Sequence, residues 1–66
     1  MSLGEKIKIA RKNEKMTQLE LADFLGITKA TICQYEKNYA FPSLPNFKKI
    51  CEKLHLDAND LLQSIN

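Results

Sequence analysis

Residues 17–36 read TQLELADFLGITKATICQYE and contain two short helical patterns separated by only a few residues. The first begins with a capping box, in which the hydroxyl of Thr17 and the carboxylate of Glu20 each accept the other residue's backbone N–H. Gly26 suits the left-handed backbone that ends a helix, and Thr28 suits the cap that begins the next one. So short a joint forces the two helices to cross steeply. The stretch therefore predicts a helix-turn-helix.

The remaining sequence repeats apolar residues every three or four positions, which is typical of helices, and has no alternating stretch typical of a strand. Ser43 and Asp57 commonly cap the start of a helix. We expect five helices, over residues 3–14, 18–25, 29–37, 44–54 and 58–64. The side chains expected to face the core are Leu3, Ile7, Ala10, Glu14, Leu21, Ala22, Leu25, Ile32, Tyr35, Leu44, Phe47, Ile50, Cys51, Leu54, Leu61, Leu62 and Ile65, with Met16 and Leu56 filling the joints. Residues 1–66 are therefore expected to form one compact all-α domain.

The length and charge of the chain limit the functions that it can have. Its 66 residues can build one modest core, with little room for an enclosed catalytic pocket. Ten basic and eight acidic residues leave a net charge of +2, so charge alone does not indicate nucleic-acid binding. The single histidine, His55, has no evident nucleophile or carboxylate partner in the sequence. We expect no enzymatic activity and no small-molecule substrate.

The two cysteines do not suggest a metal site. Cys33 and Cys51 lie 18 positions apart, and with one histidine they match no zinc-binding spacing. We expect two free thiols, with Cys51 in the core, and no metal or cofactor, while a disulfide is the alternative. No apolar run approaches the roughly 20 residues that span a bilayer, and no signal-peptide pattern is present. The expectation is a cytoplasmic protein without membrane contact.

The chain resembles the lambda-repressor-like (Cro/XRE-type) helix-turn-helix family along nearly its whole length. The matching positions are Ile7, Arg11, Thr17, Gln18, Leu21, Ala22, Gly26, Ile32, Glu36, Pro42, Ser43, Leu44, Lys49, Ile50, Leu54, Leu61 and Leu62. The resemblance implies a compact five-helix DNA-binding domain whose helix-turn-helix, residues 17–37, is formed by the second and third helices. It further implies a sequence-specific, repressor-like transcriptional regulator. Such a protein would read the major groove of double-stranded DNA with helix 29–37, as a homodimer on a two-fold operator.

The resemblance also implies a role for individual residues. It assigns base reading to Lys29, Ala30 and Gln34, with Thr31 and Cys33 beside them. It assigns DNA-backbone contacts to Gln18, Thr28, Lys37, Asn38 and Tyr39. Arg11 and Glu36 match a structural ion pair that ties the first helix to the end of the third. The chemistry of the readers agrees, since Gln34 can pair with adenine, Lys29 can bind guanine or a nearby phosphate, and Ala30 can contact a thymine methyl.

The sequence departs from the family pattern where several helices end. Family members usually place glycine at positions that here hold Lys15, Asn38 and His55. If the left-handed backbone is kept, Lys15 and His55 each cost about 1 kcal/mol of stability, whereas asparagine tolerates this conformation. These substitutions bear on the loops and on stability, and not on the fold.

Other interpretations remain open at this point. The same fold can serve as a protein-interaction module, including the antitoxin of a toxin–antitoxin pair. Lys29 and Gln18 can also be ordinary surface residues, and oxidation of Cys33 is a further way to block binding. The last helix, with Leu62 and Ile65, is the expected dimer surface.

Overall fold

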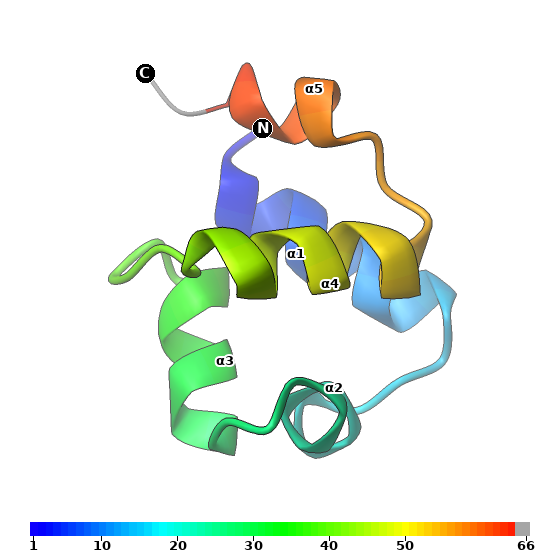
Figure 1. The fold of residues 1–66 in the computed structure, drawn as a ribbon, viewed down its shortest axis with the longest axis vertical. Helices are drawn as coiled ribbons and strands as arrows, with labels where there is room; N and C mark the ends of the chain where they lie inside the picture. The colour runs from blue at the N-terminus through cyan, green and yellow to red at the C-terminus, as the bar shows by residue number, and fades with distance from the viewer. Residues whose placement is uncertain (65–66) are drawn as a thin grey trace.

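The computed structural model describes residues 1–64, which form five helices and no strand (Figure 1). The helices are α1 (Leu3–Asn13), α2 (Gln18–Leu25), α3 (Lys29–Glu36), α4 (Leu44–Leu54) and α5 (Ala58–Leu62). The prediction of an all-α, five-helix domain is confirmed, and α2 and α4 have the predicted bounds. The prediction placed the ends of α1 and α3 one residue too late, and the end of α5 two residues too late. Beyond Leu62 the chain tightens into a turn, with the N–H of Ser64 donating to the carbonyl of Leu61 at 3.0 Å.

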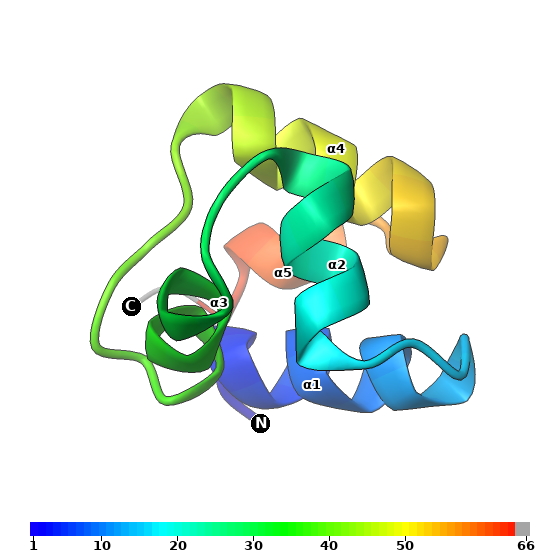
Figure 2. The ribbon, with the colours of Figure 1, turned by 90° about the horizontal axis from the view of Figure 1, so that it is seen from below.

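The helix α1 is the centre of the arrangement. It packs against α3, α4 and α5, while α2 packs against α3 and α4. Figure 1 shows α2 and α3 below α1 and α5 above it, and in Figure 2, which is seen from below, α2 and α3 lie in front and α5 lies behind them. Within the described residues, none of the helices has the length and apolar character that crossing a bilayer requires.

Every helix contributes one large aliphatic side chain that is fully buried. These residues are Ile7, Leu21, Ile32, Ile50 and Leu61, from α1 to α5 in turn. Met16 and Leu56 are partly buried against this core at the joints, as predicted. Because each helix buries its apolar stripe against the same cluster, most of its stability comes from this packing.

Three side chains that were expected in the core lie outside it. Glu14 follows the last residue of α1 and is exposed. Leu44 is the first residue of α4 and is 80% exposed, and Leu62 is the last residue of α5 and is 51% exposed. Helical spacing places these residues on an apolar stripe but cannot show how far the core extends along it. Ile65 lies outside the described residues.

Four helices end in the same left-handed turn. The residues with positive φ are Lys15 (57°), Gly26 (71°), Asn38 (63°) and His55 (57°). In each case the next N–H donates to a carbonyl five residues earlier: Met16 to Arg11 at 3.1 Å, Ile27 to Ala22 at 3.0 Å, Tyr39 to Gln34 at 2.9 Å and Leu56 to Cys51 at 2.9 Å. This bond satisfies a carbonyl that the helix end would leave unpaired. The left-handed backbone is therefore kept at the three positions where this chain lacks the family's glycine.

The helix starts are capped as predicted. Thr17 and Glu20 form a capping box, and the side chains of Thr28, Ser43 and Asp57 each accept a backbone N–H of the helix that they precede. A second capping box, at the start of α1, was not predicted: the Ser2 hydroxyl accepts the N–H of Glu5, and the Glu5 carboxylate accepts the N–H of Ser2. These caps satisfy N–H groups that have no partner within the helix.

Candidate nucleic-acid interface

Helix α3 has one buried and one outward surface. Ile32, Tyr35 and Glu36 are buried, and the predicted readers Lys29, Ala30 and Gln34 are exposed. The flanking residues Thr31 and Cys33 are half-buried. The three central readers therefore lie on the side of α3 that the core leaves open to a ligand.

The joint between α2 and α3 sets how far α3 protrudes. Gly26 takes the left-handed conformation at φ 71°, and Ile27 is half-buried against the core. Ala22 is fully buried in the same core cluster, which allows the two helices to approach closely. In Figure 1, α3 stands upright while α2 is seen end-on, so their axes cross steeply, as the short joint predicted.

A buried polar network lies between the first three helices. Glu36 Oε2 accepts a hydrogen bond from Arg11 Nε at 2.7 Å, and Glu36 Oε1 accepts one from Arg11 Nη2 at 3.1 Å. Arg11 Nη1 donates to the carbonyl of Met16 at 2.8 Å, and Gln18 Nε2 donates to Glu36 Oε1 at 3.0 Å. The structure thus brings Arg11 and Glu36 together as the expected ion pair. Its link to Gln18 was not predicted.

Two of the residues that are expected to contact the DNA backbone lie at the start of a helix. Gln18 is half-buried at the first position of α2, where its own N–H and that of Leu19 donate to no acceptor among residues 1–64. The Thr28 hydroxyl accepts the N–H of Thr31 at 3.2 Å and lies 2.9 Å from the Thr31 hydroxyl. Free N–H groups at a helix start are suited to an anion such as a phosphate.

The other residues that are expected to contact the DNA backbone lie in the loop after α3. Lys37 and Tyr39 are exposed. The side chain of Asn38 has a different role: its Oδ1 accepts the N–H of Gly4 at 2.9 Å, and its Nδ2 donates to the hydroxyl of Ser2 at 3.0 Å. Asn38 therefore joins the loop to the start of α1, and this contact between residues 34 positions apart gave no signal in the sequence.

The charges on this surface favour an anionic ligand. Lys29 begins α3 and Lys37 follows its last residue. The only acid in residues 28–39 is Glu36, which is buried and paired with Arg11. Because no exposed carboxylate interrupts the outward surface of α3, the two lysines act on a ligand without opposition from this helix.

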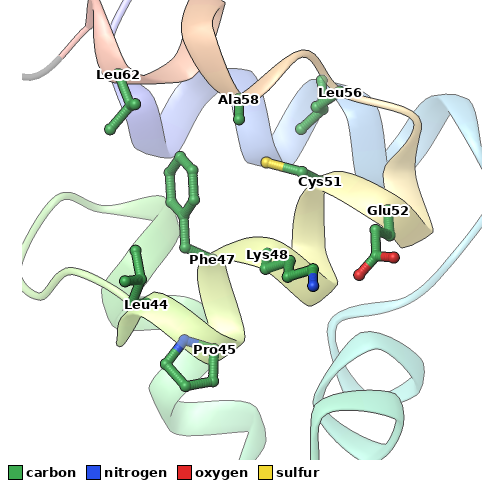
Figure 3. Close-up of a pocket in the computed structure, with 9 residues that line it drawn as sticks. All are labelled: Leu44, Pro45, Phe47, Lys48, Cys51, Glu52, Leu56, Ala58 and Leu62. Atoms are coloured by element: carbon green, nitrogen blue, oxygen red, sulfur yellow. The ribbon is translucent and has the colours of Figure 1, made fainter.

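A separate apolar groove lies between α4 and α5, which make few contacts with each other (Figure 3). Its volume is about 740 Å³, and its lining residues are Leu44, Pro45, Phe47, Lys48, Cys51, Glu52, Leu56, Ala58 and Leu62. Burial, and then the negative charges of Asp57 and Glu52, raise the pKa of the Cys51 thiol, which is therefore protonated at neutral pH. Both cysteines are free, so the disulfide alternative is excluded. Leu44 and Leu62, which were assigned to the core, instead line this groove.

Comparison with known proteins identifies the family. A family model described as a helix-turn-helix domain matches residues 4–66. Antitoxin HipB from Escherichia coli O6:H1 is 41% identical over 54 residues, which are 82% of this chain and 57% of HipB. YonR, an uncharacterized prophage-derived HTH-type transcriptional regulator of Bacillus subtilis strain 168, is 35% identical over 60 residues, 91% of this chain and 56% of YonR. The chain spans about half the length of these two relatives.

A solved structure agrees with the sequence relatives. The P22 c2 repressor protein, crystallised with synthetic operator 9T, has a TM-score of 0.89 to this structure. The two chains are 26% identical, and the match covers 97% of each. Its fold is therefore shared over all five helices. The chain belongs to the helix-turn-helix domain family, in its lambda-repressor-like branch.

Proposed function

We propose that this chain is the DNA-binding domain of a sequence-specific, repressor-like transcriptional regulator that inserts α3 into the major groove of operator DNA. The observation that carries the proposal is the outward surface of α3, where the readers Ala30 and Gln34 lie between Lys29 and Lys37 and residues 28–39 include no exposed acid. The crystal structure of the P22 c2 repressor with its synthetic operator supports the same use of this fold. A protein that binds chromosomal DNA in a bacterial cell would act in the cytoplasm.

The three base-reading residues differ in the base that each can contact. Gln34 can donate and accept at adenine, Lys29 can donate to guanine, and the methyl group of Ala30 can contact thymine. Each good pairing contributes about 1–3 kcal/mol of discrimination between bases. Thr31 and Cys33 flank these positions with half-buried side chains and add contact at the edges of the surface.

A second group of residues is proposed to hold the DNA backbone. Gln18 and Thr28 begin the two helices of the motif, and Lys37 and Tyr39 follow α3. Phosphate contacts fix the protein on the duplex without reading its sequence. In this proposal Asn38 contributes through the shape of the loop, because its side chain is engaged with Gly4 and Ser2.

We also propose that two copies associate through the α4–α5 groove. Its exposed leucines, Leu44 and Leu62, would be removed from water by a second copy. Lys48 and Glu52 lie four positions apart beside the groove. If two α4 helices pack antiparallel about a two-fold axis, Lys48 of each copy faces Glu52 of the other. A second copy is therefore the occupant that these charges fit.

Selection of bound duplexes from a random DNA pool tests the DNA-binding proposal. We expect an enriched two-fold sequence whose affinity falls steeply with salt concentration. Gln34→Ala should relax the preference at one base position, whereas Gln18→Ala should weaken binding to all sequences about equally. The absence of an enriched sequence together with a flat salt response would contradict the regulator.

Sedimentation of single variants tests the proposed dimer. Leu44→Lys should shift the protein towards the monomer, because it places a charge inside the apolar contact. Ile9→Lys is the matched control, since Ile9 is an exposed aliphatic residue of α1 outside the groove. Equal dimerisation by the Leu44→Lys variant and the wild type would overturn the proposed interface.

The second candidate function is a protein-interaction module, such as the antitoxin of a toxin–antitoxin pair. The 41% identity to the antitoxin HipB favours it. The two candidates differ in one measurement: a regulator selects a DNA sequence, whereas a module that acts only on proteins does not. An antitoxin that also binds DNA would pass the selection and, in addition, bind a partner protein.

A further inference from the structure

We propose that the buried ion pair between Arg11 and Glu36 positions Gln18 for its contact with a DNA phosphate, and so controls DNA affinity as well as stability. The inference rests on the proposed function, because it assigns Arg11 and Glu36 as positioning residues for one of its backbone contacts. A purely structural pair would hold helices together and would affect DNA binding only when the domain unfolds.

The geometry links the pair directly to the side chain of Gln18. The two oxygens of Glu36 accept three hydrogen bonds, and the third donor, at 3.0 Å, is Nε2 of Gln18. The remaining guanidinium donor, Arg11 Nη1, holds the carbonyl of Met16 two positions before Gln18. The pair therefore fixes both the amide of Gln18 and the backbone that leads into α2.

The chemistry of the amide makes this fixing useful. A phosphate oxygen only accepts hydrogen bonds, so Gln18 must contact it through an N–H. The side-chain amide has two N–H groups. Glu36 accepts a hydrogen bond from one of these N–H groups, and this bond sets the plane of the amide and the direction of the other N–H. A glutamine that is ordered before binding loses less conformational entropy when it meets the phosphate.

Arg11 has a second effect in this arrangement. A lone carboxylate behind Gln18 would repel an approaching phosphate. The guanidinium lies 2.7 Å from Glu36 Oε2 and compensates this negative charge, with both side chains almost fully buried. Glu36 can therefore accept from Gln18 without a net charge that opposes the DNA.

The test needs a variant that removes the pair without leaving a buried charge. Replacing both partners by apolar residues, as in Arg11→Met with Glu36→Leu, is often tolerated, whereas removing one partner is not. The double substitution leaves nine basic and seven acidic residues, so the net charge stays at +2. Long-range attraction to DNA is then unchanged, and a loss of affinity reports on local positioning.

A double-mutant cycle on DNA affinity separates positioning from structure. The probe is the tightest duplex recovered by the selection experiment, and folding is checked by circular dichroism and urea denaturation. We expect the Arg11→Met/Glu36→Leu variant to fold and to bind about five- to tenfold more weakly, with Gln18→Ala causing a similar loss. Combining all three substitutions should cause no further loss. Because Gln18 is neutral, the dependence of affinity on salt should not change.

Lys29→Ala provides the matched control cycle. Lys29 lies at the opposite end of α3 and has no bond to the network, so its effect should multiply with that of the paired substitution. Glu36→Gln provides a second variant, which keeps an acceptor for Gln18 but leaves the buried Arg11 without its counter-charge, so its folding is checked in the same way. Its effect on affinity should likewise vanish in the Gln18→Ala background, and the side-chain amide signals of Gln18 in NMR spectra should shift without DNA.

Specific outcomes overturn the inference. Wild-type affinity of the paired variant, or losses that multiply with Gln18→Ala, would show that the pair does not act through Gln18. A reduced salt dependence would show that Arg11 itself contacts a phosphate. If Gln18→Ala weakens binding but its effect is independent of the Arg11→Met/Glu36→Leu substitution, only this inference is rejected and the proposed function stands. Failure to select any duplex rejects the proposed function, and the inference with it.

Discussion

The helix-turn-helix half of the molecule, α1 to α3, and the half formed by α4 and α5 complete their surfaces in different ways. In the first half, Arg11, Glu36 and Gln18 satisfy one another beneath α3, and Asn38 ties the loop to α1. In the second half, α4 and α5 leave an apolar groove with Leu44 and Leu62 exposed. The first half satisfies its buried polar side chains within a single chain, and the second has an apolar groove that no part of residues 1–64 covers.

This difference suits the proposed function, in which so small a domain must present a rigid surface to DNA. Buried polar contacts are directional, so they fix the relative positions of α1, α2 and α3 more narrowly than apolar contacts do. An apolar groove is less demanding of its partner's geometry. Base reading requires helices in fixed relative positions, whereas association of two copies requires an apolar surface that can accept its partner. The predictions below alter one half at a time, in order of decreasing expected effect on stability.

The largest effect is expected when one partner of the buried ion pair is removed. Arg11→Met leaves the carboxylate of Glu36 buried without its cation, which typically costs about 3–5 kcal/mol. Urea denaturation should show this loss in the free energy of unfolding, and the Arg11→Met/Glu36→Leu variant should recover most of it. A single variant as stable as the wild type would mean that the carboxylate of Glu36 does not need Arg11 as its buried partner.

A smaller effect is expected where α1 meets the end of α3. A Cβ added to Gly4 would lie 2.5 Å from the carbonyl oxygens of both Tyr35 and Glu36. Gly4→Ala should therefore destabilise the domain by about 1–3 kcal/mol through overpacking, although alanine normally stabilises a helix. Thermal unfolding measures the change, with exposed Lys8→Ala in α1 as the control. A stabilised Gly4→Ala variant would show that α1 and α3 can separate without cost.

Local signals account for most of what the sequence predicted. The caps at Thr17, Thr28, Ser43 and Asp57 fixed the starts of four helices, because a cap depends only on residues within one turn. The left-handed conformation at Lys15 and His55 was left open by the sequence, because lysine and histidine do not favour it. The prediction was weaker at the far ends of α1, α3 and α5, where no cap marks the last residue as clearly.

The parts that could not be predicted depend on contacts between distant residues. Gln18 and Glu36 are 18 positions apart, and Gly4 and Asn38 are 34 apart. Such bonds exist only once the helix crossings are set. The exposed position of Leu44 was missed for a related reason: helical spacing identifies an apolar face but does not show whether the core or a groove lies against it.

The half formed by α4 and α5 should respond to relief of backbone strain after α4. His55 has a φ of 57°, a conformation that glycine adopts at lower cost. His55→Gly should raise the free energy of unfolding by about 0.5–1 kcal/mol, since its side chain is mostly exposed and its 3.8 Å contact with Glu14 is weak. Lys15→Gly has the same geometry in the other half and should give a similar gain. Destabilisation by His55→Gly would mean that the imidazole packs more usefully than its exposure suggests.

The smallest effect concerns the capping box at the start of α2. The backbone N–H of Thr17 donates to the Glu20 carboxylate at 2.8 Å, and this bond, followed by the Thr17 side chain, lowers the pKa of Glu20 from its ordinary value of 4.5. A carboxyl group whose pKa is lower in the folded state stabilises that state above the unfolded pKa, and the contribution disappears as the pH falls through the folded value.

Glu20→Gln isolates this contribution, because glutamine keeps an acceptor at position 20 but does not titrate. The wild type should be the more stable protein at pH 7, and the difference should shrink as the pH is lowered through 4.5 towards 3. Urea denaturation of both proteins over this range measures the difference directly. Since the box sits where Gln18 and the free N–H groups of α2 face the proposed phosphate, a difference independent of pH would show that the charge of Glu20 does not help to order that end of the interface.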